Sequence, residues 1–422
     1  MKENVILITM DAVRPDRLSC YGYNKIKTKG IDAIAKEGVL FKNCIATSCL
    51  TPVAHASILS GKNPDKTGVR DPFCTVKTTL VSEILKREGY KTAGFVGIDL
   101  IGSRHGFNKG FDYFDEPTEK DGFHRMWFRG DKQKIKATLG NWWIDRMFNW
   151  LKKHADVPFF IWGHYFHVHF LAEKELLYSG KLNPNELYDY AYYDAKIKYM
   201  DEQLFQPLVK TLKKLNIWEN TIIIVTSDHG ETLGTKNPTW KTFYFDYPQH
   251  KTMYESDLKV PLIIKSKKLE KKEIDHMVRS IDIVPTLLDL LDIKIDENFD
   301  GVSLLPLIKG KRFPELIAYA EELFKNRGPG SIQAVRTSKY KLIRNITKNV
   351  EEFYNLEKDP QEKNNLINKA NFEEKKIIEE FRKIMDKMYE SYVSKVAITK
   401  EEKTEKEKIK IKKVLQKIKR TV

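Results

Sequence analysis

The chain has 422 residues and carries 73 Lys and Arg against 58 Asp and Glu, a formal net charge of +15. At this length we expect two or three structural units, and the 41% hydrophobic and 11% aromatic content excludes wholesale disorder. Residues 395–422 have a net charge of +7, which leaves +8 for the first 394 residues. Because nearly half of the excess lies on this tail, the charge does not indicate a nucleic-acid-binding body.

The four cysteines are too few and too irregularly spaced for a disulfide framework, and no CxxC pair suggests zinc, which favours a reducing compartment. The N-terminal apolar run, residues 5–8, is too short for a signal sequence. No stretch of about 20 apolar residues predicts a membrane span. We therefore expect a cytoplasmic protein.

Over residues 1–310, short β-branched runs alternate with helical patterns, which is typical of a mostly parallel sheet flanked by helices. The predicted strands are 4–10, 92–98, 158–165, 221–227 and 260–265. The predicted helices are 30–37, 80–88, 140–154 and 188–215. This pattern predicts a single α/β domain.

A small antiparallel subdomain is predicted for residues 311–394. Its expected strands are 332–336, 339–345 and 351–356, followed by a helix over 372–392 with one apolar face. Residues 395–422 interleave basic and apolar side chains as in a basic amphipathic helix. That helix either docks on its own domain or a second subunit, or contacts anionic lipid or a partner protein.

Candidate metal ligands follow two of the predicted strands. Asp11 ends the first strand, and Asp228 and His229 end the strand 221–227. The carboxyl ends of parallel strands open onto a common crevice, and these side chains suit Mg²⁺, Mn²⁺, Ca²⁺ or Zn²⁺. Asp11 alone is equally consistent with a turn or helix cap.

Residues 48–61 are expected to form a loop that enters a helix. Thr51 is predicted as its N-cap and Pro52 as its first residue, with Gly61 at its end. A hydroxyl at a helix N-terminus lies where a phosphate or sulfate is favoured, although the local pattern alone favours Thr51 as no more than a cap.

These segments resemble, in order, the motifs of the sulfatase family within the alkaline phosphatase superfamily. The motifs are residues 10–23, 51–61, 228–231, His250 with Tyr254 and 260–264, 280–287, 300–304 and 353–360. The resemblance covers nearly all of residues 4–368. It implies an alkaline phosphatase-like fold, a divalent metal held by Asp11, Asp228 and His229, and a metal-linked nucleophile, Thr51, that forms a covalent intermediate.

The chain departs from the sulfatase pattern at the nucleophile. Sulfatases resemble Cys-x-Pro-x-Arg there, with the Cys or Ser converted to formylglycine, whereas counting back from Gly61 places Thr51 in that position and His55 in the Arg position. Ala12 stands where sulfatases usually have another metal-binding Asp, and residues 98–103 lack the expected Lys and His. These departures favour phosphodiester or phosphonate substrates over sulfate esters.

Further site residues follow from the same resemblance. Residues 164–169 resemble the family's His-containing loop, where His169 matches the position that contacts substrate or protonates the leaving group, and His167 would share its strand face. His250 and Lys251 resemble a later His-Gly pair, with Lys251 available to a phosphate oxygen. His169 and His250 holding a second metal is the alternative to a single site.

We therefore expect a metal-dependent hydrolase of small anionic esters, with Thr51, His169 and His250 catalytic and with His55, His167 and Lys251 binding substrate. No nucleic-acid partner is expected, and the oligomeric state is not readable from the sequence. One alternative is a true sulfatase that uses formylglycine at Cys49. The other is a non-catalytic protein that binds metal, a membrane or a partner.

Overall fold

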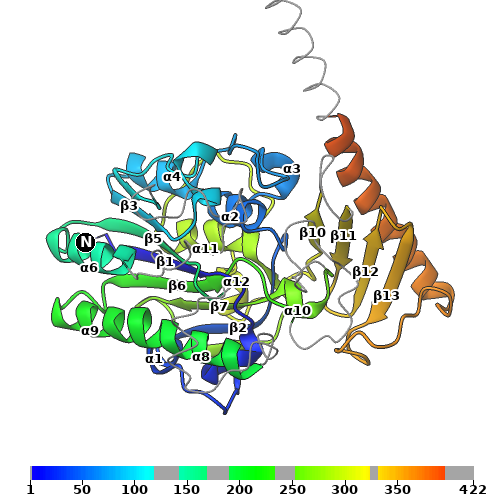
Figure 1. The fold of residues 1–422 in the computed structure, drawn as a ribbon, viewed down its shortest axis with the longest axis horizontal. Helices are drawn as coiled ribbons and strands as arrows, with labels where there is room; N and C mark the ends of the chain where they lie inside the picture. Colours follow the sequence, from blue (N-terminus) through cyan, green and yellow to red (C-terminus); the bar gives the residue numbers. More distant parts are fainter. Residues whose placement is uncertain (1, 118–141, 169–189, 233–251, 324–330, 395–422) are drawn as a thin grey trace, which may run out of the picture. The chain divides into compact units, whose positions relative to one another are not determined.

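The computed structural model describes residues 2–117, 142–168, 190–232, 252–323 and 331–394. It divides into two compact units, Met1–Asn368 and Lys369–Val422. The first unit contains both β-sheets and every candidate site residue that the structure describes. It is the mixed α/β architecture that the sequence predicts (Figure 1).

A nine-stranded sheet forms the centre of this unit, in the order β4-β3-β5-β1-β6-β7-β2-β8, with β9 paired to β2. Strands β4, β3, β5, β1 and β6 are mutually parallel, whereas β7 runs antiparallel to β6 and β2. The bounds are β1 Asn4–Met10, β2 Gly38–Ile45, β3 Lys91–Val96, β4 Tyr113–Asp115, β5 Phe159–Tyr165, β6 Thr221–Ser227, β7 Lys259–Lys265, β8 Lys272–Ile274 and β9 Val278–Arg279. Central β1 lies between β5 and β6, so its end is enclosed on both sides.

Helices cover both faces of this sheet (Figure 1). Alternate side chains of β1 point to opposite faces, and those on each face pack in a separate hydrophobic core that helices cover. Val5 and Leu7 belong to the core under α2 Thr51–Ser60, α4 Val81–Arg87, α11 Ile283–Leu290 and α12 Leu305–Ile308. Ile6 and Ile8 belong to the core under α1 Lys29–Ala35, α6 Trp142–Lys153, α8 Tyr190–Met200 and α9 Gln206–Lys214. The predicted helix 188–215 thus contains α8 and α9, joined by a π-helical turn at Asp201–Phe205.

Short helical turns complete this unit at the ends of strands and in loops. The α-helical ones are α3 Pro64–Thr67 and α10 Glu255–Leu258, and the 3₁₀ turns are Pro15–Arg17, Ser19–Tyr21, Asp99–Ile101, Ser103–His105 and Ser280–Asp282.

The second sheet is antiparallel and has four strands in chain order: β10 Ala318–Glu322, β11 Ile332–Arg336, β12 Tyr340–Asn345 and β13 Val350–Asn355. Three of them match predicted strands, and β10 is additional. Backbone and side-chain bonds tie β10 to the loop before α2: Glu321 N–H donates to Thr47 O (3.0 Å), and Ser48 Oγ donates to Glu321 O (2.7 Å).

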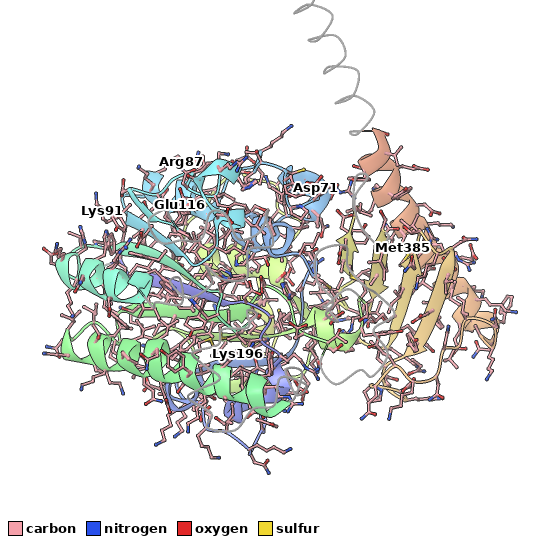
Figure 2. All side chains as sticks on the ribbon, in the orientation of Figure 1. Asp71, Arg87, Lys91, Glu116, Lys196 and Met385 are labelled. Carbon is pink, nitrogen blue, oxygen red and sulfur yellow. The ribbon has the colours of Figure 1, made fainter. Side chains whose placement is uncertain are left out.

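In the second unit, residues 372–394 form the predicted helix, on which Figure 2 labels Met385. The side chains of Ile378, Phe381 and Met385 are buried. The basic tail, residues 395–422, lies outside the described residues. Among the described helices, none combines the length and the apolar character that crossing a membrane requires.

Candidate active site

The site begins where the central strands end. Asp11 follows β1, and its N–H donates to Tyr165 O at the end of β5 (2.9 Å). Asp228 follows β6, and its N–H donates to Met10 O (3.3 Å). Parallel pairing, in which Met10 lies opposite Ser227, therefore brings the two carboxylates together, as the strand-end argument predicts.

The chain leaves β1 through a left-handed residue. Ala12 has φ 59°, a conformation that costs a non-glycine residue free energy unless its surroundings hold it. The Ala12 N–H donates to Asp228 Oδ1 (3.2 Å), and the Tyr193 hydroxyl donates to Ala12 O. Asp228 Oδ1 also accepts the His229 N–H (2.8 Å), so this oxygen braces the turn while Oδ2 faces the site.

His229 is fixed by its own loop. Its Nδ1 donates to Gly230 O (2.8 Å), which leaves Nε2 directed at Asp11 Oδ1 (3.7 Å) and Asp228 Oδ2 (3.6 Å). Gly230 packs so closely on α10 that an added Cβ would lie 2.0 Å from Ser256 O. Only glycine fits at this position without moving the backbone.

α2 begins at Thr51, one residue earlier than the predicted start at Pro52. Leu50 is the N-cap, and no side chain caps the helix, so the prediction of Thr51 as a cap is wrong. Its hydroxyl instead lies 3.5 Å from both Asp11 Oδ2 and His229 Nε2. Gly61 ends the helix in the left-handed conformation, as predicted. The structure thus places a hydroxyl beside the acidic cluster.

The geometry of this cluster fits a divalent cation. One ligand atom from each of Asp11, Asp228 and His229 lies within 4.8 Å of the others, and all three side chains are buried. Within the described residues, Asp11 Oδ1 and Asp228 Oδ2 accept no hydrogen bond. Buried charged oxygens without partners are costly, and a bound cation would satisfy them. Oxygen and imidazole ligands are acceptable to Mg²⁺, Mn²⁺, Ca²⁺ and Zn²⁺ in different degrees.

The electrostatics support the same fit. Burial, together with the charge of Asp228, raises the pKa of Asp11 well above its usual value. Burial works against a positive charge on His229, but Asp228 and Asp11 outweigh it and raise the His229 pKa. These side chains therefore form an electronegative cluster that favours added positive charge.

His55 and His164 lie directly behind this cluster and are fully buried. His55 Nδ1 bonds to Thr51 O (2.8 Å) and its Nε2 bonds to Thr9 Oγ1 (2.9 Å). Burial and the neighbouring His164 lower the His55 pKa to about 3, and burial lowers the His164 pKa to about 4. His55 therefore braces the first turn of α2 and is neutral near pH 7.

Cys49 does not join this site. Its side chain is fully buried in an apolar cluster with Ile45, Met253 and Leu258, and its Sγ lies 3.8 Å from Met253 Sδ. Burial raises the pKa of its thiol well above the usual value. Cys49 and Thr51 are only two positions apart in sequence, but of these two residues only Thr51 contacts the acidic cluster.

The remaining predicted site residues are only partly described. β5 ends at Tyr165, so His167 lies in a turn and not on a strand, and it belongs to neither group of clustered potential ligands in the described residues. His169, His250 and Lys251 lie outside the described residues. Their predicted roles stay predictions.

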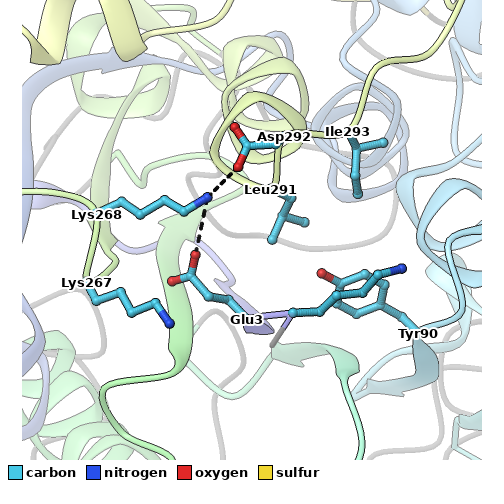
Figure 3. Close-up of a pocket in the computed structure, with 8 residues that line it drawn as sticks. Glu3, Tyr90, Lys267, Lys268, Leu291, Asp292 and Ile293 are labelled. Atoms are coloured by element: carbon cyan, nitrogen blue, oxygen red, sulfur yellow. Dashed lines mark hydrogen bonds and ion pairs between the residues drawn. The ribbon is translucent and has the colours of Figure 1, made fainter.

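A surface pocket of about 430 Å³ lies at the opposite ends of the strands (Figure 3). Lys268 there pairs with Glu3 (3.7 Å) and Asp292 (2.8 Å). None of its lining residues belongs to the cluster at Asp11 and Asp228. It is therefore separate from the candidate active site.

Comparison with sequence models of protein families identifies the family of this chain. The sequence model of the family described as Sulfatase matches residues 3–293, more than half of the chain. The chain belongs to the sulfatase family. A second model, described as "N-sulphoglucosamine sulphohydrolase, C-terminal", matches residues 243–391 and so includes the antiparallel sheet. The predicted family is thereby confirmed.

Relatives in this family include an ulvan-active sulfatase of Formosa agariphila, 29% identical over 88% of this chain and 78% of its own. An arylsulfatase of Clostridium perfringens is 27% identical over 92% of this chain and 95% of its own. A solved structure in complex with D-glucosamine-2-N,6-O-disulfate has a TM-score of 0.70 at 21% identity, with 93% and 98% covered. The phosphonate monoester hydrolase of Agrobacterium radiobacter also has a TM-score of 0.70, at 18% identity, with 92% and 96% covered.

These relatives bear on the expected substrate. The curated relatives are named as sulfatases, and a phosphonate monoester hydrolase occurs among the structural neighbours. The chain is thus a family hydrolase of ester bonds, as predicted. The predicted preference for phosphodiesters receives no support, because the named family members favour the sulfate-ester alternative.

Two residues beside the cluster were not predicted from the sequence as site residues. Thr9 and His164 face each other across the β1–β5 pairing and sit directly behind Asp11. A polar residue inside a continuous apolar strand was the available signal, because a buried Thr or His requires a hydrogen-bond partner. Both strands interrupt their apolar runs in this way.

Proposed function

We propose that this protein is a metal-dependent hydrolase of sulfate esters on small anionic substrates. The observation that carries the proposal is the position of the Thr51 hydroxyl, 3.5 Å from Asp11 Oδ2 and from His229 Nε2 at the edge of a buried, electronegative cluster. Membership of the sulfatase family supports the reaction class.

Asp11, Asp228 and His229 would hold the divalent cation, with the Thr51 hydroxyl facing it. A bound cation supplies positive charge that lowers the pKa of a nearby hydroxyl and stabilises negative charge on the ester oxygens. The carboxylates would keep the cation at the end of β1, and the bond from His229 Nδ1 to the Gly230 carbonyl leaves His229 Nε2 directed at the two carboxylates.

Thr51 acts as the nucleophile in this proposal. Its hydroxyl loses its proton to solvent, Oγ forms a bond to sulfur while the bond from sulfur to the ester oxygen breaks, and the leaving alcohol takes a proton from a general acid. Water then cleaves the sulfo-threonine and releases sulfate. His169 and His250 are the proposed acids, on the strength of the family resemblance.

His55 is proposed to position Thr51 and not to contact substrate. Both of its ring nitrogens are engaged within the protein, and the side chain is fully buried. Its bond to Thr51 O fixes the first turn of α2. The predicted substrate-binding role of His55 in the family's Arg position is thus less favoured than a role in shaping the nucleophile loop.

Hydrolysis of phosphonate or phosphodiester esters is a second candidate. The favouring observation is that a threonine, and not a cysteine, lies at the acidic cluster. Cys49 is buried among apolar side chains and is therefore poorly placed to carry formylglycine for a substrate.

A substrate panel tests both candidates. Aryl sulfate, phosphate, phosphodiester and phosphonate esters are assayed with Mn²⁺, Zn²⁺, Ca²⁺ and Mg²⁺, and we expect the sulfate ester to be cleaved fastest. A preference for the phosphodiester or phosphonate would select the second candidate. If the protein turns over none of these esters and Thr51→Ala has no effect, the remaining interpretation is the non-catalytic protein that binds metal, a membrane or a partner.

Mass spectrometry of the peptide that contains Cys49 and Thr51 identifies the nucleophile. We expect an unmodified Cys49 and, after rapid acid quenching during turnover, a sulfo or phospho group on Thr51. Formylglycine at Cys49 would overturn the assignment of Thr51.

A further inference from the structure

We propose that His164 is an additional protein ligand of the bound metal, and that Thr9 is the positioning residue that holds its ring in the ligating tautomer. The inference rests on the proposed function, because it concerns the metal at Asp11, Asp228 and His229. It adds a second imidazole from β5, the strand on the other side of β1.

The position of His164 points to this role. Thr9 and His164 are register partners in the β1–β5 pairing, and His164 is fully buried. Its Nε2 lies 3.3 Å from Asp11 Oδ2, and His164 forms with His55 and Asp228 a second group of clustered potential ligands, which shares Asp228 with the group of Asp11, Asp228 and His229. The same carboxylates that approach His229 therefore also approach His164.

Hydrogen bonds around Thr9 determine which ring nitrogens carry protons. Thr51 O only accepts, so His55 Nδ1 must be the donor in their 2.8 Å bond. Neutral His55 then has a bare Nε2, which accepts the Thr9 hydroxyl proton across 2.9 Å. That hydroxyl has a single proton, so His164 Nδ1, 3.1 Å away, must donate to Thr9 Oγ1.

This proton arrangement leaves a lone pair on His164 Nε2. The atom makes no hydrogen bond within the described residues, although it is buried beside Asp11. A lone pair that faces a carboxylate oxygen at 3.3 Å is unfavourable unless a proton on Asp11 or a metal cation lies between the two atoms. Metal-bound histidines commonly have their other ring nitrogen held by a protein acceptor, which is the part that Thr9 plays here.

His55 does not qualify as a ligand by the same criterion. Although it lies near Asp228, at 3.7 Å from Nδ1 to Oδ2, both of its nitrogens already have nearer hydrogen-bond partners. The inference therefore assigns two imidazole ligands to the metal, His229 and His164.

Electron paramagnetic resonance of the full chain with substoichiometric Cu²⁺ counts these nitrogens. We expect coupling to two imidazoles in the unmodified protein and to one in His164→Phe, with Mn²⁺ affinity by calorimetry weakened at least about tenfold. His164→Asn, which is too short to reach the metal, gives a second variant if phenylalanine prevents folding. Asp228→Asn shows whether the copper signal comes from this site.

The outcomes separate this inference from the function on which it rests. If the unmodified protein binds metal through one imidazole, and His164→Phe binds Mn²⁺ equally well, His164 is structural and the inference fails while the function stands. If the unmodified protein binds no metal at the Asp228 site, the metal-dependent function itself fails.

The role of Thr9 has its own test. Thr9→Val keeps the shape and removes the hydroxyl, and we expect Mn²⁺ affinity to fall by about 10- to 100-fold, with recovery in Thr9→Ser. If Thr9→Val loses thermal stability but keeps the affinity and the two-nitrogen copper spectrum, Thr9 has only a packing role.

Discussion

At the scale of single residues, the site depends on which atoms are left without partners. Among the described residues, the Thr51 hydroxyl has only long hydrogen-bond contacts, at 3.5 Å, whereas the Asp228 Oδ1 atom accepts from two backbone N–H groups. One set of atoms therefore builds the turn, and the other set is available to metal and substrate. Substitutions at the two kinds of atom should have different consequences.

Removal of the Thr51 hydroxyl should abolish turnover without unfolding the protein. We expect Thr51→Ala to lower kcat by at least about 10³-fold, because the covalent step is lost, while the melting temperature stays nearly unchanged. Thr51→Ser retains the hydroxyl and should keep measurable activity. Equal activity in Thr51→Ala and the unmodified protein would exclude Thr51 as the nucleophile.

Asp228 should control metal-dependent stability. A ligand that binds only the folded state stabilises it by about 2.7 kcal/mol at 100 times its dissociation constant. Adding Mn²⁺ should therefore raise the melting temperature of the unmodified protein by a few degrees, and chelation should reverse the change. We expect Asp228→Asn to lose this response, whereas Asn substitution at exposed Asp296 should retain it.

At the scale of elements, the site is formed by strand ends and by the helix that begins beside them. β1 supplies Asp11, β6 supplies Asp228 and His229, and α2 supplies Thr51. Such an arrangement is predictable because buried parallel strands are continuous apolar runs that end at polar residues. The contribution of β5 through His164 was not predicted, since it depends on the register with Thr9.

The close contact of Gly230 with α10 should be essential for His229. A methyl group there meets Ser256 O at 2.0 Å, so we expect Gly230→Ala to shift His229 and to weaken Mn²⁺ binding by about tenfold or more. Gly89→Ala is the control, because its added Cβ meets nothing within 4 Å although φ is +80°. The control should lose stability but no affinity, and equal Mn²⁺ dissociation constants in both variants would contradict the prediction.

The loop before α2 should depend on the antiparallel sheet. Ser48 Oγ donates to Glu321 O (2.7 Å) and accepts the Leu50 N–H (3.1 Å), one residue before the nucleophile. Ser48→Ala leaves a buried N–H without its partner, at a cost of about 1–3 kcal/mol. We expect kcat to fall with Mn²⁺ affinity unchanged within about twofold. Ser303→Ala, at an exposed hydroxyl, should change neither.

At the scale of the whole first unit, charged contacts join the antiparallel sheet to the main sheet. Glu255 on α10 bonds to Arg336 on β11 (2.8 Å) and to Lys341 on β12 (3.2 Å). Burial opposes ionisation of Glu255, but these two cations outweigh it and lower its pKa to about 2. The ion pairs therefore stabilise the folded state only where Glu255 is ionised.

This lowered pKa predicts acid sensitivity. The stabilisation is fully present above the unfolded value of about 4.5 and is lost as the pH falls toward 2. Glu255→Gln should lower the free energy of unfolding by roughly 2 kcal/mol at pH 7, and the difference from the unmodified protein should shrink as the pH falls from about 5 toward 2. Urea unfolding at each pH measures this difference in the free energy of unfolding, with the surface variant Glu270→Gln as the control. A difference that does not change with pH would contradict the prediction.

The limits of sequence-based prediction in this unit have physical causes. β2 was missed because Lys42 and Asn43 interrupt its apolar run, at the point where its pairing with β7 shifts register. β10 was missed because it ends in Glu321 and Glu322, which are buried, with Glu321 compensated by Arg70 from a distant loop. No local pattern reveals such a partner. The cytoplasmic location and the role of residues 395–422 stay predictions.

The central place of β1 has a consequence for biogenesis. Asp11 and Asp228 are 217 positions apart in the sequence, so β1 is synthesised long before β6, the strand that brings Asp228 beside Asp11. Because closing so long a loop is slow, one edge of the apolar strand β1 stays unpaired and exposed until β6 has been synthesised and has paired with it. Nascent chains that end before residue 221 should consequently retain no metal and should need protection from aggregation.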